Sequence, residues 1–431
     1  MLTLPMPKQF SKISVVGLGY VGLPLSLQFA RSSMSVIGLD LDSAKVDAIN
    51  SGKSYLKHFS SESIAEQVQA GRFEATTDPA RISEVEAILI CVPTPLDDHR
   101  EPDLSFVLNT ARSVAPYLPE GVLVTLESTT YPGTTEDALR LILEEGSGMK
   151  AGVDFHLAYS PEREDPGRED ASVKTIPKVV GGFTAKCADL AEALYGQAID
   201  EIHRVSSCRA AEATKLLENI FRSVNIALVN ELKVVYEAMG IDVHEVISAA
   251  ATKPFGFMAF RPGPGLGGHC IPIDPFYLTW KAREFGKHTR FIELAGEINT
   301  AMPNYVVSKV VDALNDQDKA VNGSKILILG LAYKANVDDC RESPSFVLMQ
   351  NLVSRGAQVE YHDPFVPVIP ETREHAQLSG KQSVSIEDKY DLILLSTDHA
   401  EYKNFDFSNF NCPIVDTRNC ITYRPAKYFQ A

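Results

Sequence analysis

The chain has 431 residues, of which 45% are apolar, so it can build two or three domains with their own cores. Its formal net charge of −15 argues against nucleic acid or an anionic membrane as the main partner. The seven cysteines include no CxxC pair, which argues against a disulfide framework or a zinc site and fits a reducing compartment. The first ten residues lack the apolar core of a signal peptide, and no apolar run reaches the roughly 18 residues of a membrane span. We therefore expect a soluble cytoplasmic protein without a bound metal.

A glycine-rich turn separates the first predicted strand, Ile13–Val16, from a predicted helix, Leu23–Arg31. The G-x-G-x-x-G residues of this turn are Gly17, Gly19 and Gly22, with Tyr20 and Val21 between the last two. Such glycines permit a tight turn and close approach of a pyrophosphate, which the helix N-terminus attracts. The next strand, Val36–Leu39, ends at Asp40, whose carboxylate can bind a ribose diol and would repel a 2′-phosphate. This arrangement predicts an NAD site.

Three further segments, Ala87–Val92, Val122–Leu126 and His156–Ser160, are predicted strands of the same sheet. Ligands bind at the carboxyl ends of parallel strands. The loops that follow these strands therefore supply candidate site residues, namely Thr94, Thr129, Glu162 and Arg163. Two alternatives stay open. Thr134 or Thr135 could do no more than cap a helix, and the charged loop after Ser160 could be ordinary surface charge.

Residues from about Ala210 to Met239 have the periodicity of one long amphipathic helix. The apolar positions that define its expected buried stripe are Leu216, Ile220, Val224, Leu228, Leu232 and Val235. About 30 residues would span roughly 45 Å, so we expect this helix to bridge two domains and carry a dimer interface. Glu212, Lys215 and Asn219 share another stripe. They form either a solvated face with a weak ion pair or a cation and an amide donor aimed into a cleft.

The segment Gly263–Pro275 is rich in glycine and proline and contains Cys270 and Asp274. Ionised cysteine is a strong nucleophile, and an aspartate four residues later can orient water or accept a proton. One interpretation is a surface loop with an incidental thiol. We favour a buried functional loop, because the apolar residues Phe255, Phe257 and Phe260 precede it.

A second α/β half follows, with an incomplete set of phosphate-binding glycines. Its predicted strands are Lys325–Gly330, Ala357–Tyr361, Leu392–Leu395 and Pro413–Asp416. The predicted fold class is α/β, with two Rossmann-like doubly wound parallel sheets joined by a long central helix. We expect an NAD-binding domain at 1–205, a central helical domain with the cysteine loop at 206–305, and a second Rossmann-like domain at 306–431 that either serves another part of a nucleotide ligand or retains only the fold.

Taken together, these segments resemble the nucleotide-sugar 6-dehydrogenase family over nearly the whole chain. The motifs that carry the resemblance are Gly17–Pro24, Val92–Pro95, Ser160–Arg163, Ala211–Asn219, Gly267–Cys270 and Asp338–Pro344. The family oxidises C6 of a UDP-sugar twice, from alcohol to aldehyde to carboxylate, and reduces NAD at each step. The resemblance thus implies an enzyme with a UDP-sugar substrate, for surface polysaccharide biosynthesis of the bacterial type, most simply as a homodimer.

The resemblance also implies roles for individual residues. Cys270 would attack the aldehyde and later carry a thioester, Asp274 and Thr129 would hold a proton-accepting water, Lys215 and Asn219 would stabilise oxyanions, and Glu162 would assist hydrolysis. The implied NAD-binding residues are Gly17, Gly19, Tyr20, Val21, Gly22, Asp40, Thr94, Thr129 and Arg341. The implied substrate-binding residues are Glu162, Arg163, Lys215, Asn219, Phe260, Arg261, Gly263, Gly267 and Arg418.

The substrate branch is indicated by two departures from the glucose-specific members. Ile273 precedes Asp274 where those members have lysine, and the loop after Glu162 is shorter. Both features resemble the N-acetylhexosamine branch, and within it the UDP-N-acetylglucosamine enzymes. UDP-N-acetylmannosamine and UDP-glucose remain alternatives, since pocket shape decides a single stereocentre. Two readings outside this chemistry are a catalytically silent NAD-binding regulatory protein and a two-electron hydroxy-acid dehydrogenase.

Overall fold

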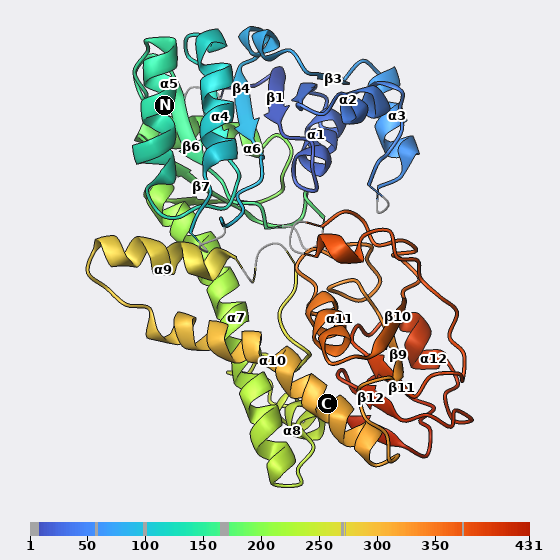
Figure 1. Cartoon of the computed structure of the whole chain (residues 1–431). Coiled ribbons are helices and arrows are strands. Elements are labelled where there is room, and N and C mark those ends of the chain that lie inside the picture. Colours follow the sequence, from blue (N-terminus) through green and yellow to red (C-terminus); the bar gives the residue numbers. More distant parts are fainter. Residues whose placement is uncertain are drawn as a thin grey trace. The chain divides into compact units, whose positions relative to one another are not determined.

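The computed structural model describes residues 8–56, 59–97, 101–163, 172–268, 271, 273–372 and 375–431. The chain forms two compact units (Figure 1). The first contains residues 1–218 and 276–287, and the second contains residues 219–275 and 288–431. Among the residues described, no helix combines the length and apolar character needed to cross a membrane. The six cysteines in this part of the chain are all free thiols.

The first unit is built on an eight-stranded sheet of order β3-β2-β1-β4-β5-β6-β7-β8. Its strands are β1 Lys12–Val16, β2 Ser35–Leu39, β3 Phe73–Thr76, β4 Ala87–Ile90, β5 Leu123–Leu126, β6 His156–Tyr159, β7 Lys178–Gly182 and β8 Ile202–Val205. The order of the first six is that of dinucleotide-binding folds. This confirms the predicted α/β class, with one difference: β6 and β7 pair antiparallel.

Helices cover both faces of this sheet, so its strands are apolar on both sides. Val15 and Leu89 belong to one buried cluster, whereas their neighbours Val16 and Ile90 belong to the other, because successive side chains of a strand point to opposite faces. The helices of this unit are α1 Gly22–Arg31, α2 Ser43–Asn50, α3 Ser61–Gln69, α4 Ser105–Val114, α5 Arg140–Ser147, α6 Ala185–Tyr195 and most of α9 Asp274–Glu284.

The long helix α7 spans Cys208–Ala238 and contributes to both units, as the sequence predicted. Its predicted apolar stripe is wrong in part, because Leu228 and Val235 are 51% and 45% exposed. The polar stripe of Glu212, Lys215 and Asn219 is buried instead, so the solvated-face interpretation of these residues is also wrong. Burial of three polar side chains on one helix requires partners, which the site supplies.

The second unit is built on a five-stranded parallel sheet of order β10-β9-β11-β12-β13. Its strands are β9 Lys325–Leu329, β10 Gln358–His362, β11 Leu392–Leu395, β12 Ile414–Asp416 and β13 Tyr428–Gln430. The last strand was not predicted. The remaining helices are α8 Val243–Ala250, α10 Arg290–Asn315, α11 Pro344–Ser354 and α12 Ala400–Asn404.

Candidate functional site

In the glycine turn of the first unit, one glycine has room for a side chain and two do not. A Cβ on Gly17 would lie 2.8 Å from the Cys91 carbonyl oxygen, and a Cβ on Gly22 would lie 1.8 Å from that of Gly17. Gly17 also has φ +90°, which favours glycine. A Cβ on Gly19, by contrast, would meet no atom within 4 Å. Gly17 and Gly22 are therefore required by packing, whereas the space over Gly19 is free for a ligand to approach the backbone.

Helix α1 begins directly after this turn, and no side chain caps its N-terminus. Within its first turn the Leu23 N–H donates to the Gly19 oxygen and Pro24 has no N–H, so this end offers an anion the Gly22 N–H and the positive end of the helix dipole. Asp40, at the end of β2, accepts from the backbone N–H of Leu18 at 2.8 Å, and Lys45 lies 3.5 Å from the same carboxylate. An open glycine, an uncapped helix and a strand-terminal carboxylate fit the pyrophosphate and ribose of NAD.

The loops after β4 and β5 are fixed by internal hydrogen bonds. Thr94 is buried, and its carbonyl oxygen accepts from the Tyr277 hydroxyl at 2.7 Å. Ser128 donates to the Val92 carbonyl oxygen at 2.7 Å, which joins the two loops beside the half-buried Thr129. These contacts place Thr94 and Thr129 at the carboxyl edge of the sheet, as the sequence predicted for site loops.

Glu212 has a role that the sequence did not reveal. Its carboxylate accepts from the backbone N–H groups of Gly133 and Thr135 and from the Thr135 hydroxyl, at 2.6, 2.9 and 2.7 Å. These groups begin the π-helical turn Thr134–Leu139, which no side chain of Thr134 or Thr135 caps. The alternative of threonine capping is therefore wrong. Burial raises the pKa of Glu212 to about 7, although the three donors oppose this shift.

The loop after β6 brings three predicted residues together. Lys215 of α7 donates from Nζ to the backbone oxygen of Glu162. Arg163 pairs with Glu218 of α7 at 2.6 Å and donates to the Pro177 carbonyl oxygen at 2.7 Å. Arg163 is therefore committed to internal contacts rather than being free surface charge. Residues 164–171 of this loop lie outside the described part of the chain.

The second unit places two further predicted residues in direct contact. Asn219 donates from Nδ2 to Oδ2 of Asp274 at 2.5 Å, and both side chains are buried. Asp274 begins α9, directly after the cysteine loop. Cys270 itself lies outside the described residues, as do residues 269 and 272. Lys215 and Asn219 are four positions apart on α7, so they share one face of that helix.

The glycine loop before Cys270 packs tightly within the second unit. The N–H of Gly263 donates to Oδ1 of Asn230 at 3.0 Å, and a Cβ on Gly263 would lie 2.4 Å from the Arg418 guanidinium. The N–H of Gly268 donates to the Arg341 carbonyl oxygen at 3.1 Å. A Cβ on Gly267 would lie 2.7 Å from Cβ of Tyr333, which belongs to the same loop as Arg341. The glycines thus allow two loops to approach closely.

The aromatic residues before this loop are not buried as expected. Phe255 and Phe257 are 71% and 43% exposed, so the argument from apolar flanks is wrong for the residues before the loop. Tyr277, which follows the loop, is buried, as are Gly263 and Gly268. Phe260 packs edge-on against Phe221 with ring centroids 5.8 Å apart. Arg261 donates to the backbone oxygen of His244 and to the Ser248 hydroxyl, so its guanidinium lies against α8.

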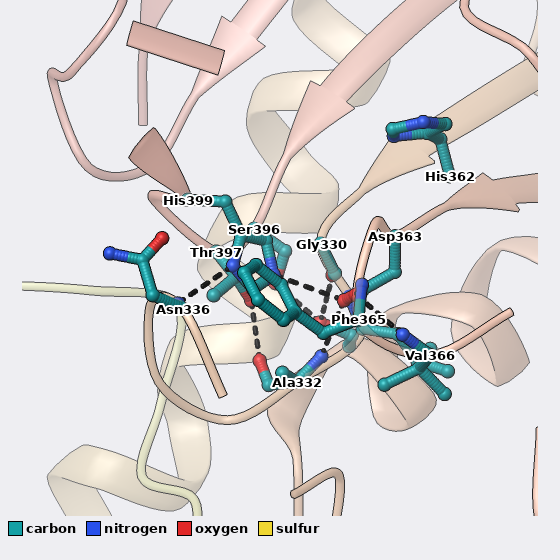
Figure 2. Close-up of polar contacts among 12 residues, drawn as sticks. Gly330, Ala332, Asn336, His362, Asp363, Phe365, Val366, Ser396, Thr397 and His399 are labelled. Atoms are coloured by element: carbon teal, nitrogen blue, oxygen red, sulfur yellow. Dashed lines mark hydrogen bonds and ion pairs between the residues drawn. The ribbon is translucent and has the colours of Figure 1, made fainter. Parts of the chain in front are cut away.

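A second strand-terminal acid, Asp363, follows β10 and was not among the predicted site residues. Figure 2 shows it at the centre of a polar cluster. Its Oδ2 accepts from the N–H groups of Leu331 and Ala332 at 2.6 and 2.9 Å, and its Oδ1 accepts from those of Phe365 and Val366 at 2.8 and 3.0 Å.

A buried histidine completes this cluster. His399 Nδ1 accepts from the Asn336 N–H at 2.9 Å, so Nε2 carries the proton and donates to Asp363 at 3.1 Å (Figure 2). Burial alone would raise the pKa of Asp363, but the His399 hydrogen bond and the backbone donors outweigh burial and hold it below its ordinary value. The acid thus fixes the loop that follows β9.

Comparisons with known proteins match this architecture. Three family models match consecutive parts of the chain, all of the UDP-glucose/GDP-mannose dehydrogenase family: the NAD-binding domain over residues 11–199, the central domain over 209–301 and the UDP-binding domain over 327–423. A UDP-N-acetyl-D-glucosamine 6-dehydrogenase of Pseudomonas aeruginosa is 37% identical over 92% of this chain and 93% of its own length. A UDP-N-acetyl-D-mannosamine dehydrogenase of Pyrococcus horikoshii is 35% identical over 97% of both chains.

Solved structures agree with the sequence comparisons. The structure of the UDP-D-ManNAc dehydrogenase from Pyrococcus horikoshii superposes with a TM-score of 0.88 at 33% identity, covering 97% of this chain and 98% of that one. A UDP-glucose dehydrogenase from Pyrobaculum islandicum superposes with a TM-score of 0.87 at 26% identity over 99% of both chains. The similar proteins therefore share one architecture and differ in the sugar that their names record.

Proposed function

Because the chain belongs to the UDP-glucose/GDP-mannose dehydrogenase family, an NAD-dependent oxidoreductase family, we propose that it oxidises C6 of UDP-N-acetylglucosamine to a carboxylate. The product is UDP-N-acetylglucosaminuronate, a building block for surface polysaccharide of the bacterial type. The observation that carries this proposal is the buried hydrogen bond between Asn219 and Asp274. It joins an amide donor and a carboxylate of the proposed catalytic set directly beside the cysteine loop.

The proposed chemistry needs two oxidations, and NAD, held by the glycine turn and Asp40, would supply the hydride acceptor for both. Asp274 and Thr129 hold the water that takes the alcohol proton in the first oxidation. The Cys270 thiolate then adds to the aldehyde, and the thiohemiacetal loses the second hydride to leave a thioester. Lys215 and Asn219 stabilise the negative charge on the sugar oxygen in these steps. Glu162 assists the water that releases the carboxylate.

Binding residues follow from the same proposal. In the first unit, the turn at Gly17, Gly19 and Gly22 and the carboxylate of Asp40 hold NAD, together with the flanking Tyr20 and Val21 and the loop residues Thr94 and Thr129. Arg341 is assigned to NAD from the resemblance alone. In the second unit, Gly263, Gly267 and Arg418 are proposed to bind the substrate, and the close approach of the Arg418 guanidinium to Gly263 supports the pairing of these two. Phe260 and Arg261, and from the first unit Glu162 and Arg163, complete the proposed substrate contacts.

The sugar specificity is the finest part of the proposal. Similar proteins include UDP-N-acetylglucosamine and UDP-N-acetylmannosamine dehydrogenases and an NDP-N-acetyl-D-galactosaminuronic acid dehydrogenase of Ralstonia nicotianae. The test is kcat/KM on UDP-N-acetylglucosamine, UDP-N-acetylmannosamine, UDP-N-acetylgalactosamine and UDP-glucose, with the uronate identified by mass. We expect UDP-N-acetylglucosamine to exceed the others by at least about tenfold, because one misplaced polar group costs about 1.4 kcal/mol or more. A higher value for another sugar would contradict the assignment.

A silent NAD-binding protein is the alternative from another class, and Cys270→Ser separates the two. The enzyme should lose carboxylate formation and keep NAD binding, because only the thiolate can carry the acyl group. The control is Cys187→Ser, which changes a free thiol on α6 that has no proposed role. A native protein that forms no carboxylate from any of these sugars would favour the silent alternative.

The assembly and domain limits are also proposals. Exposed apolar side chains recur along α7 at Phe221, Leu228 and Val235. These positions are seven residues apart, so they lie on one side of the helix, and we propose that a second copy of the chain covers them to form a homodimer. The domain limits 1–205, 206–305 and 306–431 and a cytoplasmic location belong to the same proposal.

A further inference from the structure

A buried lysine in the first unit contacts two carboxylates, one of which belongs to the proposed site. Lys178 begins β7, and its Nζ lies 2.5 Å from Oε2 of Glu127 and 3.7 Å from Oε2 of Glu162. Lys178 and Glu127 are almost fully excluded from solvent. Desolvation offsets most of the attraction in a buried ion pair, so stability alone is a weak reason to keep one. Its place at the carboxyl edge of the sheet suggests a role in the reaction.

Glu127 is held on both oxygens. It follows β5 directly, accepts from Lys178 on Oε2 and accepts from the Tyr195 hydroxyl on Oε1. Burial raises the pKa of Glu127, whereas the Lys178 ammonium and the hydrogen bonds from Lys178 and Tyr195 favour its ionised form. Lys178 also lies over the Tyr195 ring, 5.3 Å from its centroid. Burial alone would lower the pKa of Lys178, but the two carboxylates outweigh it and raise that pKa, so Lys178 stays cationic.

Other charged and titratable groups also face Glu162. Lys215 donates to its backbone oxygen, and the Arg163 N–H donates to its Oε1 at 2.7 Å. The Cys91 thiol lies beside the same cluster, and burial raises the pKa of Cys91 well above its ordinary value, so this group is neutral. The Lys178 ammonium, in contrast, acts directly on the Glu162 carboxylate.

We propose that Lys178 is a positioning residue that orients the Glu162 carboxylate, and that Glu127 is the second carboxylate that shares the Lys178 ammonium and holds it in place. This inference rests on the proposed function, in which Glu162 assists thioester hydrolysis. In that step Glu162 takes a proton from water while the water oxygen bonds to the thioester carbonyl carbon. The carbon–sulfur bond then breaks, the Cys270 thiolate leaves and the sugar is released as its carboxylate. Hydrolysis needs no oxidant or reductant.

The proposal predicts that substitutions of Lys178 and of Glu127 shift the pH profile in opposite directions. Lys178→Met removes the cation that lies 3.7 Å from the Glu162 carboxylate and favours its charged form, so the acid limb of the hydrolysis rate should move to higher pH by about one unit. Glu127→Gln leaves Lys178 to act on Glu162 alone, so the acid limb should move to lower pH by up to about one unit. Lys178→Arg keeps the cation and should restore most of the native profile.

The test measures two quantities between about pH 5.5 and pH 9 with saturating NAD and UDP-N-acetylglucosamine. One is the steady-state rate of carboxylate formation. The other is the fraction of the enzyme that carries a sugar thioester, measured by acid quench and intact mass. At the low end of this range we expect Lys178→Met to lower the rate about tenfold and to raise the adduct fraction. A purely structural role would change neither limb of the profile.

Matched controls are Lys174→Met and Glu120→Gln, which remove exposed charges of the same two types. The inference would be overturned if the acid limb stays in place in both Lys178→Met and Glu127→Gln, or moves in the same direction in both. If Lys178→Met fails to fold, Glu127→Gln and Lys178→Arg still decide it. Failure of the proposed function is a separate result: the native enzyme would then form no NADH with any UDP-sugar, whatever the variants do.

Discussion

Each unit has a carboxylate at the same place in its sheet, but the two carboxylates differ in how many hydrogen bonds they accept from the protein. Asp40 ends the second strand of the first unit, and Asp363 follows the corresponding strand of the second. Each accepts from the glycine loop of its neighbouring strand, after Gly17 and Gly330, whose φ angles are +90° and +87°. Asp40 retains capacity to accept further hydrogen bonds at a partly exposed site, whereas Asp363 accepts four backbone N–H groups and the His399 ring proton.

The comparison shows how a shared fold can separate ligand binding from loop support. The glycine turn of the first unit leaves open space above Gly19, whereas a Cβ on Gly330 would lie 2.4 Å from Cβ of Thr397. In the second unit, Asp363 holds the loop that supplies the Arg341 carbonyl oxygen to Gly268, two residues before Cys270. In the proposed function the first acid binds a dinucleotide directly, whereas the second supports the cysteine loop through intervening backbone.

The largest expected effect comes from Asp363→Asn. This change leaves backbone N–H groups facing an amide and removes the charge that His399 faces, so we expect a loss of about 3–5 kcal/mol in the free energy of unfolding. Urea unfolding monitored by far-UV circular dichroism would measure it. The matched control is Asp312→Asn on the exposed side of α10, which should cost less than about 0.5 kcal/mol. An equal effect of both changes would contradict the supporting role of Asp363.

Gly22→Ala and Gly19→Ala separate packing from ligand access within one turn. A methyl on Gly22 would meet the Gly17 carbonyl oxygen, so this variant should lose both stability and NAD binding. A methyl on Gly19 meets no protein atom, so this variant should keep its melting temperature within a few degrees and weaken NAD binding at least about tenfold. Thermal unfolding and NAD titration report the two effects. Unchanged NAD affinity in Gly19→Ala would place the cofactor elsewhere.

Asp40→Asn should weaken NAD binding by about tenfold or more, since a hydrogen bond to a charged group contributes roughly 1.5 kcal/mol. It should destabilise the protein less than Asp363→Asn does, because Asp40 makes fewer internal contacts. Isothermal titration with NAD and with NADP measures the change in affinity and the preference between the two cofactors. The contrast between the two acids fails if Asp40→Asn unfolds the protein as readily as Asp363→Asn.

The smallest expected effect is a difference in acid stability. The pKa of Asp363 is held below its ordinary 3.8, so its contribution is fully present above that pH and is lost as pH falls through the lower folded value. Unfolding midpoints measured from about pH 5 to pH 3 should therefore fall more steeply for the native protein than for Asp363→Asn. Parallel curves for the two proteins would mean that the charge of the Asp363 carboxylate contributes nothing to stability.

Local patterns predicted the parts of the molecule that depend on neighbours in sequence. The strand, glycine turn and helix around Gly17, the acid at Asp40 and the length of α7 were all predicted correctly. Partners far apart in sequence were not. Glu212 caps a turn almost eighty residues earlier. Lys178 reaches Glu127 across fifty-one residues, and no spacing reveals either pair.

The predicted buried face of α7 was wrong in part, and the reason is physical. Periodicity assumes that apolar residues face the core, but this helix buries Lys215 and Asn219 in a polar site and exposes Leu228. The reversed strand β7 and the final strand β13 were missed because direction and pairing in a sheet are set by tertiary contacts. The specific roles of the site residues therefore came from the resemblance and stay proposals.

The central claim, a four-electron oxidation that passes through Cys270, is tested most directly by stoichiometry. The measurement is the amount of NADH formed per mole of limiting UDP-N-acetylglucosamine, followed to completion with excess NAD. The account predicts two moles of NADH and one of uronate, with no free aldehyde. One mole of NADH with aldehyde as the final product would contradict it, because a single oxidation has no use for the Cys270 thiol.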